Sequence, residues 1–304
     1  MHGKLLERTL EPGSLEWLRA GVSASRIPII MGTVPPSWGS KWELWHRYAG
    51  NLPVSTPATD AQARGHFLEP AIADWWGAQH PLVRVEHTGT WVHPEDSRFL
   101  ASPDRLLAYT SGDVEVLEIK TAARPDDWAD GLPPYYVDQT QWQMGVLGVP
   151  RARVAVLTAY LEFDSLTVEF DPQRWSEMAH GATEFLDSLP DGKSPKMPPI
   201  DGSEATWAAV KKMHPKITDG DVEIPAELAA SWYEARDMAD YWDERKRRFA
   251  GEVVDRLGPF RNAVTPDGHK VGRRQGVRGG GTTLVATAGK SLSSKPAVQS
   301  GSVK

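Results

Sequence analysis

The sequence predicts an α/β (α+β) fold in which helices flank a central mixed β-sheet. Two observations indicate this class. Several long segments carry apolar residues at helical spacing, and short segments rich in β-branched residues are interspersed among them. The chain has 304 residues, of which 40% are hydrophobic, so it can form one large domain or two small ones.

The elements are placed by periodicity and by turn residues. Residues 14–31 read as a short helix, a turn of small residues and a second apolar segment. The other helices are predicted over residues 41–49, 61–79, 135–147 and 174–189. Strands are predicted over residues 83–92, 99–109, 114–121, 151–160 and 166–170. The helix at 61–79 carries Leu68, Ile72 and Trp75 on one face, which predicts a buried apolar stripe.

These elements predict a core domain over residues 1–190, followed by a Pro/Gly/Ser-rich linker at 191–203. A helical, basic extension is expected over 204–285, with a long charged helix at 226–257 and a hairpin beginning near 268–274. The composition beyond Ala286 is Ser, Gly, Ala and Lys, so disorder is expected in 286–304.

Composition excludes several classes of function. There is no cysteine, so disulfides, thiolate metal sites and cysteine nucleophiles are absent. No apolar run approaches the roughly 18 residues of a membrane span, and the first residues lack the apolar core of a signal peptide. We therefore expect a soluble, cytoplasmic protein with no membrane partner.

Charge is distributed unevenly along the chain. The net charge is −6, yet residues 245–304 contain 13 Lys/Arg and three Asp/Glu, a net of +10, which leaves −16 on residues 1–244. One interpretation is a basic surface beside an acidic, metal-binding body. The alternative is a solvated helix followed by a basic tail.

The central motif is Ser102-Pro103-Asp104 followed by Glu118-Ile119-Lys120. Side chains alternate faces on a strand, so Glu118 and Lys120 share a face while Leu117 and Ile119 point into the opposite, apolar face. A turn at 110–113 returns the chain antiparallel, which places Asp104 near Glu118. Carboxylates of this kind suit Mg²⁺, and a lysine beside them suits phosphodiester hydrolysis. The alternative is a surface Glu–Lys pair with an unrelated turn aspartate.

Two further segments bear on this site. Glu69 borders the predicted apolar stripe, where a carboxylate needs a partner or a metal, although it also suits the first turn of a helix. Gln139 and Gln141 are two residues apart, so at most one of them faces the site if this segment is helical.

Together these segments resemble the YqaJ-like viral recombinase or phage lambda exonuclease family, in the PD-(D/E)XK nuclease superfamily. The resemblance covers roughly residues 14–160. It is carried by Trp17-Leu18-Arg19-Ala20-Gly21 with Ser23-Ala24-Ser25, by Arg64-Gly65 with Leu68-Glu69-Pro70, by Ser102-Pro103-Asp104, by Leu117-Glu118-Ile119-Lys120 and by Gln139-Thr140-Gln141. The order of the five motifs matches the family.

The resemblance implies a restriction-endonuclease-like core and a 5′→3′ exonuclease on double-stranded DNA ends. Such an enzyme leaves 3′ overhangs for a single-strand annealing partner, and family members of the lambda type form ring-shaped trimers. It also implies Mg²⁺, with Mn²⁺ as a substitute, held by Asp104 and Glu118 with help from Glu69, and catalysis by Lys120 with Gln141. The 5′-phosphate would be received by the residues Arg19, Ser25, Ser102, Arg124 and Gln139.

The sequence departs from the family pattern at Arg105, where glycine is common, and matches it loosely around Arg124. Two other functions remain open. One is a RecB-like endonuclease with the same chemistry, and the other is a non-catalytic DNA-binding recombination module.

Overall fold

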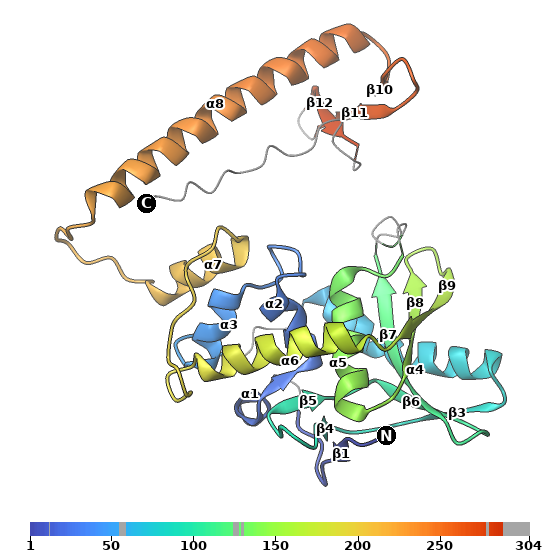
Figure 1. The fold of residues 1–304 in the computed structure, drawn as a ribbon. Helices are drawn as coiled ribbons and strands as arrows, with labels where there is room; N and C mark the ends of the chain where they lie inside the picture. Colours follow the sequence, from blue (N-terminus) through green and yellow to red (C-terminus); the bar gives the residue numbers. More distant parts are fainter. Residues whose placement is uncertain (12, 55–58, 124–127, 129–130, 278–279, 288–304) are drawn as a thin grey trace. The chain divides into compact units, whose positions relative to one another are not determined.

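The computed structural model describes residues 1–11, 13–54, 59–123, 128, 131–277 and 280–287. The chain divides into two compact units, Met1–Ile217 and Thr218–Lys304, and each is described by itself. Figure 1 shows the elements of both units in the order of the chain. None of the described helices is both long enough and apolar enough to cross a membrane.

A five-stranded mixed sheet forms the centre of the first unit (Figure 1). Its strands stand in the order β3 (Val83–Glu86), β6 (Arg105–Tyr109), β7 (Val114–Ala122), β8 (Arg151–Thr158) and β9 (Phe163–Glu169). Strands β7 and β8 run parallel, and the other neighbours are antiparallel. The predicted mixed α/β class is therefore confirmed.

Strand β7 separates two apolar layers. Its residues Leu117 and Ile119 pack against α4 (Asp60–Gln79), where they join Ile72 and Trp76. On the other face, Val116 packs in the larger core beneath α5 (Pro134–Leu147). This alternation follows from the two-residue period of a strand. It confirms that Glu118 and Lys120 share the face opposite Leu117 and Ile119, and this face is the one toward α5.

The larger core also holds the remaining helices of this face. They are α2 (Ile27–Met31), α3 (Lys41–Tyr48) and α6 (Pro172–Asp187). Helices α5 and α6 approach closely at Gly145, where a Cβ would lie 2.0 Å from Cε3 of Trp175. A side chain at this position would therefore force the two helices apart.

Two of the predicted strands are each divided in two. The segment 83–92 forms β3 and the separate β4 (Trp91–Val92), and the segment 99–109 forms β5 (Phe99–Ala101) and β6. Pro103 lies at the second break. Proline has no N–H to donate to a sheet ladder, which explains why the strand is interrupted there. Strands β4 and β5 join β1 (Lys4–Leu5) and β2 (Val22–Ser23) in a second sheet with the order β1-β4-β5-β2. Strand β2 follows helix α1 (Leu15–Ala20) and precedes a 3-10 turn at Ala24–Arg26.

The boundary of the first unit lies later than the sequence suggested. Helix α7 (Glu204–Met213), which was not resolved as an element from the sequence, packs on α3. The hydroxyl of Thr206 donates to Ser40 Oγ at 2.6 Å, and Ala209 is buried beside Trp42 and Leu52. These contacts tie α7 to the core rather than to the extension.

The second unit contains α8 (Ala226–Leu257) and a small antiparallel sheet. The sheet has the order β10 (Asn262–Val264), β11 (Lys270–Gly276) and β12 (Thr282–Ala286), so the hairpin expected near 268–274 extends into three strands. Almost all of the tail expected to be disordered, from residue 288, lies outside the described residues.

Candidate active site

Glu118 is the most enclosed acidic residue of the candidate site, with 2% of its surface exposed. Three cationic or amide groups bind its carboxylate. Lys120 donates to Oε1 from the same strand, Gln139 Nε2 donates to Oε1 at 2.5 Å, and Gln143 Nε2 donates to Oε2 at 2.7 Å. Because both glutamines come from α5, this helix fixes the orientation of the carboxylate.

Asp104 stands beside Glu118 because of the hairpin between β6 and β7. The register pairs Arg105 with Leu117, so the preceding residue Asp104 falls opposite Glu118. The Asp104 Oδ2 accepts a hydrogen bond from the backbone N–H of Ile119 at 2.7 Å. The sequence prediction that a turn brings these two carboxylates together is confirmed.

The site accumulates negative charge. Burial raises the pKa of Asp104 well above its usual value, and the neighbouring carboxylates of Glu118 and Glu69 raise it further. The ammonium of Lys120 and the Ile119 N–H act in the opposite direction but do not compensate. A cation bound beside Asp104 would relieve this repulsion between the carboxylates.

Lys120 carries its proton in this environment. Burial lowers the pKa of Lys120, but the carboxylates of Glu118 and Asp104 outweigh burial and leave the pKa raised. The ammonium also lies 4.9 Å from the ring centroid of Tyr136. A charged lysine stabilises negative charge on a phosphate better than it removes a proton from water.

Glu69 reaches the site from α4, on the opposite face of the sheet. Its Oε1 accepts a hydrogen bond from Arg105 Nη1 at 2.8 Å. Arg105 is buried and also donates to the backbone oxygen of Asp104. Arg105, which stands where the family commonly has glycine, therefore links the carboxylate of Glu69 to the backbone of Asp104.

The donors of this site suit a hard divalent cation. The described part of the chain contains no ready-made group of three or more His, Asp or Glu side chains for a metal ion. Asp104 and Glu118 nevertheless supply two adjacent carboxylates, and Mg²⁺ is commonly held by one or two carboxylates, with water and substrate phosphate completing its shell. The expected help from Glu69 stays a prediction, because Arg105 binds its carboxylate.

The glutamines of α5 divide between two faces. Gln139 and the unforeseen Gln143 contact Glu118, because residues four apart share a helix face. Gln141 points elsewhere. Its Nε2 donates to the backbone carbonyl oxygen of Glu169 at 2.7 Å, and its Oε1 accepts from the backbone N–H of Asp171 at 2.9 Å. The geometry thus gives Gln141, expected to be catalytic, a structural partner instead. The four-residue spacing between Gln139 and Gln143 is the feature of the sequence that could have identified Gln143.

The predicted phosphate residues lie on neighbouring segments. Strands β2 and β5 pair in parallel with Ser23 opposite Leu100, and Ser25 and Ser102 each follow shortly after the end of one of these two strands. Ser25 Oγ lies 3.3 Å from Ser23 Oγ, and Ser102 donates to Thr90 Oγ1 at 3.1 Å.

Neither of the basic residues expected beside these serines is shown there by the structure. Arg19 is exposed at the end of α1, and Arg124 lies outside the described residues. Arg26, which the sequence did not single out, follows Ser25 directly. Burial lowers its pKa, and its Nε is buried without a hydrogen-bond partner among the described residues.

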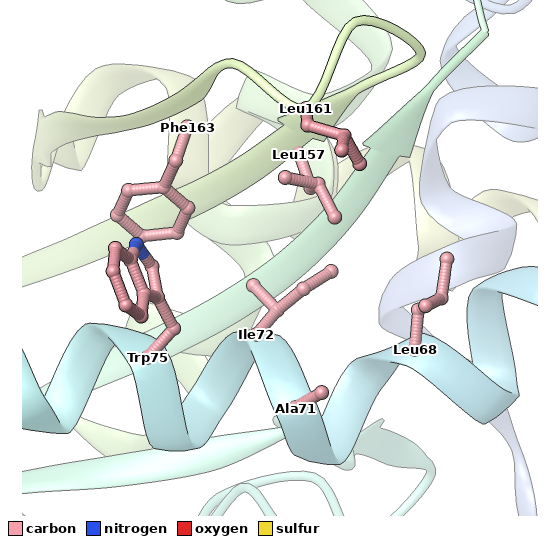
Figure 2. A pocket seen from close by; sticks show the side chains of 7 residues that line it. All are labelled: Leu68, Ala71, Ile72, Trp75, Leu157, Leu161 and Phe163. Carbon is pink, nitrogen blue, oxygen red and sulfur yellow. The ribbon is translucent and has the colours of Figure 1, made fainter.

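An apolar pocket lies on the α4 side of the molecule (Figure 2). Figure 2 shows Leu68 and Trp75 of α4 facing side chains from β8 and β9, among them Leu157 and Phe163. Ile72 is buried as predicted, but Leu68 and Trp75 are 40% and 57% exposed because their stripe borders this open pocket. The pocket has no carboxylates, so it is distinct from the candidate active site.

Residues 15–150 match the model of the YqaJ-like viral recombinase domain. This segment contains every motif residue of the carboxylate cluster. Over these residues the chain is similar to YqaJ-like viral recombinases. A relative, the uncharacterized protein YqaJ of Bacillus subtilis strain 168, is 29% identical over 220 residues, which is 69% of this chain. The match spans 66% of that relative's length.

Two solved structures are similar to part of this chain. An alkaline exonuclease from Laribacter hongkongensis has a TM-score of 0.47 and 24% identity over 58% of this chain and 92% of its own. A phage related exonuclease from Haemophilus somnus 129PT has a TM-score of 0.41 and 12% identity over 54% and 92%. Both likenesses are weak, so the chemistry of the site is taken from this chain. The match to this domain model, together with the two carboxylates and the lysine of the site, supports a nuclease enzyme.

Proposed function

We propose that this chain is a Mg²⁺-dependent deoxyribonuclease that digests double-stranded DNA from its ends in the 5′→3′ direction. The 3′ single strands that it leaves would serve a single-strand annealing partner in recombination. The observation that carries the proposal is the cluster of Asp104, Glu118 and Lys120, which a single hairpin assembles within a YqaJ-like domain.

Each residue of the cluster has a role that its environment favours. Asp104 and Glu118 would hold Mg²⁺, with Mn²⁺ as a substitute, and the ion would supply Lewis-acid activation of water and neutralise charge on the phosphate. Gln139 and Gln143 hold the Glu118 carboxylate in place. Lys120 is protonated and stabilises negative charge that develops on the scissile phosphate.

The preference for DNA ends rests on the serine segments. A terminal phosphate needs hydroxyl and guanidinium donors, since arginine binds phosphate through two parallel hydrogen bonds. Ser25 and Ser102 stand on adjacent segments, and Arg19 and Arg124 are the proposed cationic members. Arg26 is a further candidate, because its buried guanidinium keeps an unsatisfied N–H.

The deciding experiment is digestion of three DNA substrates in the presence of Mg²⁺: linear duplex with 5′-phosphates, linear duplex with 5′-hydroxyls, and a closed circle. We expect fast loss of the phosphorylated linear duplex, slower loss of the hydroxyl form, and no cleavage of the circle. Cleavage of the circle would establish an endonuclease instead.

The matched control is Asp104→Asn, which removes one proposed metal ligand and keeps its shape. This variant should bind DNA without releasing nucleotides. If the unaltered chain also binds DNA but releases none, the protein is a binding module and the proposed catalysis is wrong.

A further inference from the structure

Arg105 is a buried cation beside the carboxylates of the candidate site. Its side chain is 8% exposed. Its Nη1 donates to Glu69 Oε1 at 2.8 Å and to the backbone oxygen of Asp104. The hairpin register pairs Arg105 with Leu117, which packs against α4, so the arginine leaves β6 on the face where α4 presents Glu69. Arginine keeps its proton in proteins, so this positive charge is permanent.

Glu69 is the third carboxylate near Asp104, and its oxygens have unequal surroundings. Oε1 accepts from Arg105, whereas Oε2 faces Nδ1 of the exposed His66 at 4.0 Å. If Oε1 turned to a metal ion, the buried guanidinium would lose its partner, which is strongly unfavourable. An ion bound at Oε2 would instead lie beside a fixed positive charge that repels it.

The charges of the site limit how many ions it can hold. Asp104, Glu118 and Glu69 carry three negative charges. Lys120 and Arg105 carry two positive charges, which leaves one net negative charge. Two divalent ions about 3.5–4 Å apart would bring four positive charges into this space. In agreement, the described residues contain no group of three acidic or histidine side chains placed to hold a metal ion.

We propose that Arg105 limits this site to one divalent cation, because it holds Glu69 away from the ion and keeps a fixed positive charge in its place. This limit rests on the proposed Mg²⁺-dependent nuclease and adds the number of ions that the nuclease binds. Arg105 acts through Glu69, so it is a positioning residue. Asp104 and Glu118 alone would hold the ion, with water and substrate phosphate completing its shell.

The alternative is an ion pair that only fastens α4 to β6. Such a pair would contribute to stability, and its loss would lower the Tm without changing the number of bound ions. The two roles therefore differ in a quantity that can be measured without following DNA cleavage.

Counting bound Mn²⁺ on the full-length chain, by electron paramagnetic resonance of the free ion, tests the limit directly. The unaltered chain should bind one Mn²⁺ at a site that Asp104→Asn removes. Arg105→Gln releases Glu69 and should bind two ions, with the magnetic coupling expected of neighbouring Mn²⁺ ions. Arg105→Lys keeps the charge and should still bind one.

The double variant Glu69→Gln/Arg105→Gln is the matched control. It removes one negative and one positive charge, so the net charge of the site is unchanged, and the two amides can still form a hydrogen bond. It should bind one Mn²⁺ with a dissociation constant within about threefold of the unaltered chain. Loss of a true ligand would weaken binding by more than the roughly 10–100-fold caused by losing an outer partner. This variant keeps the test decisive if Arg105→Gln alone does not fold.

Three results would overturn the proposal. They are two Mn²⁺ bound to the unaltered chain, one Mn²⁺ bound to a folded Arg105→Gln chain, and binding at least tenfold weaker in the double variant. Digestion of linear duplex DNA by the unaltered chain in Mg²⁺ separates these failures from a failure of the proposed function. If that chain digests DNA, the nuclease stands whatever the Arg105 variants bind. If it neither digests DNA nor binds Mn²⁺ through Asp104, both the nuclease and the limit are wrong.

Discussion

The role of Lys120 is decided by its protonation. The carboxylates of Glu118 and Asp104 raise its pKa, so in the proposed mechanism it acts as a cation and not as a base at neutral pH. Lys120→Ala should lower the rate of DNA cleavage by at least about 100-fold, the effect of removing one stabilising donor from a transition state. Binding of duplex DNA, measured by fluorescence anisotropy with Ca²⁺, should stay within about threefold of the unaltered protein. Cleavage at an undiminished rate would remove the lysine from the mechanism.

Asp104 combines function with a cost in stability. Its pKa is raised in the folded protein by burial and by Glu118, so the folded state favours the protonated form. The resulting penalty is present at pH 8, decreases as the pH falls through the raised pKa, and is lost below the ordinary pKa of an aspartate. Asp104→Asn should therefore raise the Tm measured without metal at pH 8, by roughly 2–4 °C for each kcal/mol of relief.

The same variant has a second measurable consequence. Adding Mg²⁺ should raise the Tm of the unaltered chain, because a bound cation offsets the repulsion, and should leave Asp104→Asn unchanged. The gain in Tm of Asp104→Asn over the unaltered chain should also shrink toward low pH. A lower Tm for the variant at pH 8 would contradict the proposed repulsion.

At the scale of elements, local patterns predicted which residues of strand β7 share a face, but they did not predict the contacts of this strand's neighbours. The alternation of Leu117, Glu118 and Ile119 has a period of two, which is a local property, and the structure confirms it. The partner of Glu69 could not be predicted in this way. Arg105 meets it across the sheet, and such a contact depends on tertiary packing between α4 and β6.

Helix α5 has one face that contacts Glu118 and another that contacts the backbone of Glu169 and Asp171. Gln143→Met removes one donor from Glu118 and should weaken Mg²⁺ binding about 10–100-fold, as expected when an outer partner of a metal ligand is lost. Gln141→Met removes the partners of Glu169 and Asp171 and should cost about 1–3 kcal/mol of stability with Mg²⁺ affinity unchanged. Calorimetric titration and thermal melting distinguish the two effects, and equal effects on metal affinity would refute the division.

Helix packing at Gly145 allows a prediction about stability alone. An alanine Cβ there would meet the ring of Trp175 at 2.0 Å, so Gly145→Ala should lower the free energy of unfolding by about 1–3 kcal/mol. Gly65→Ala in α4 is the matched control. Its Cβ would make an ordinary contact of 3.5 Å with Thr121 Oγ1, and alanine favours a helix, so this change should be neutral or stabilising by up to about 1 kcal/mol. Urea unfolding measures both.

At the scale of the whole molecule, composition indicated that an extension follows the core, but the boundary itself was set by contacts. The Pro/Gly/Ser-rich stretch at 191–203 has the composition of a linker. Helix α7 nevertheless returns to the core through Thr206 and Ala209. Only burial and hydrogen bonding show that the first unit continues to Ile217, because the helical period alone does not say where an amphipathic helix docks.

This boundary gives the last prediction. A chain that ends at Ile217 keeps the five-stranded sheet, its covering helices and the contacts of α7, so it should fold and melt cooperatively, with a Tm within about 3 °C of the same unit in the full chain. It should also digest linear duplex DNA, because Asp104, Glu118 and Lys120 all lie in this unit. A chain cut earlier, after Leu189, is the matched control. It loses α7 and exposes Trp42 and Leu52, and should be less stable. If both truncated chains melted alike, α7 would contribute nothing to the core, and the boundary at Ile217 would be wrong.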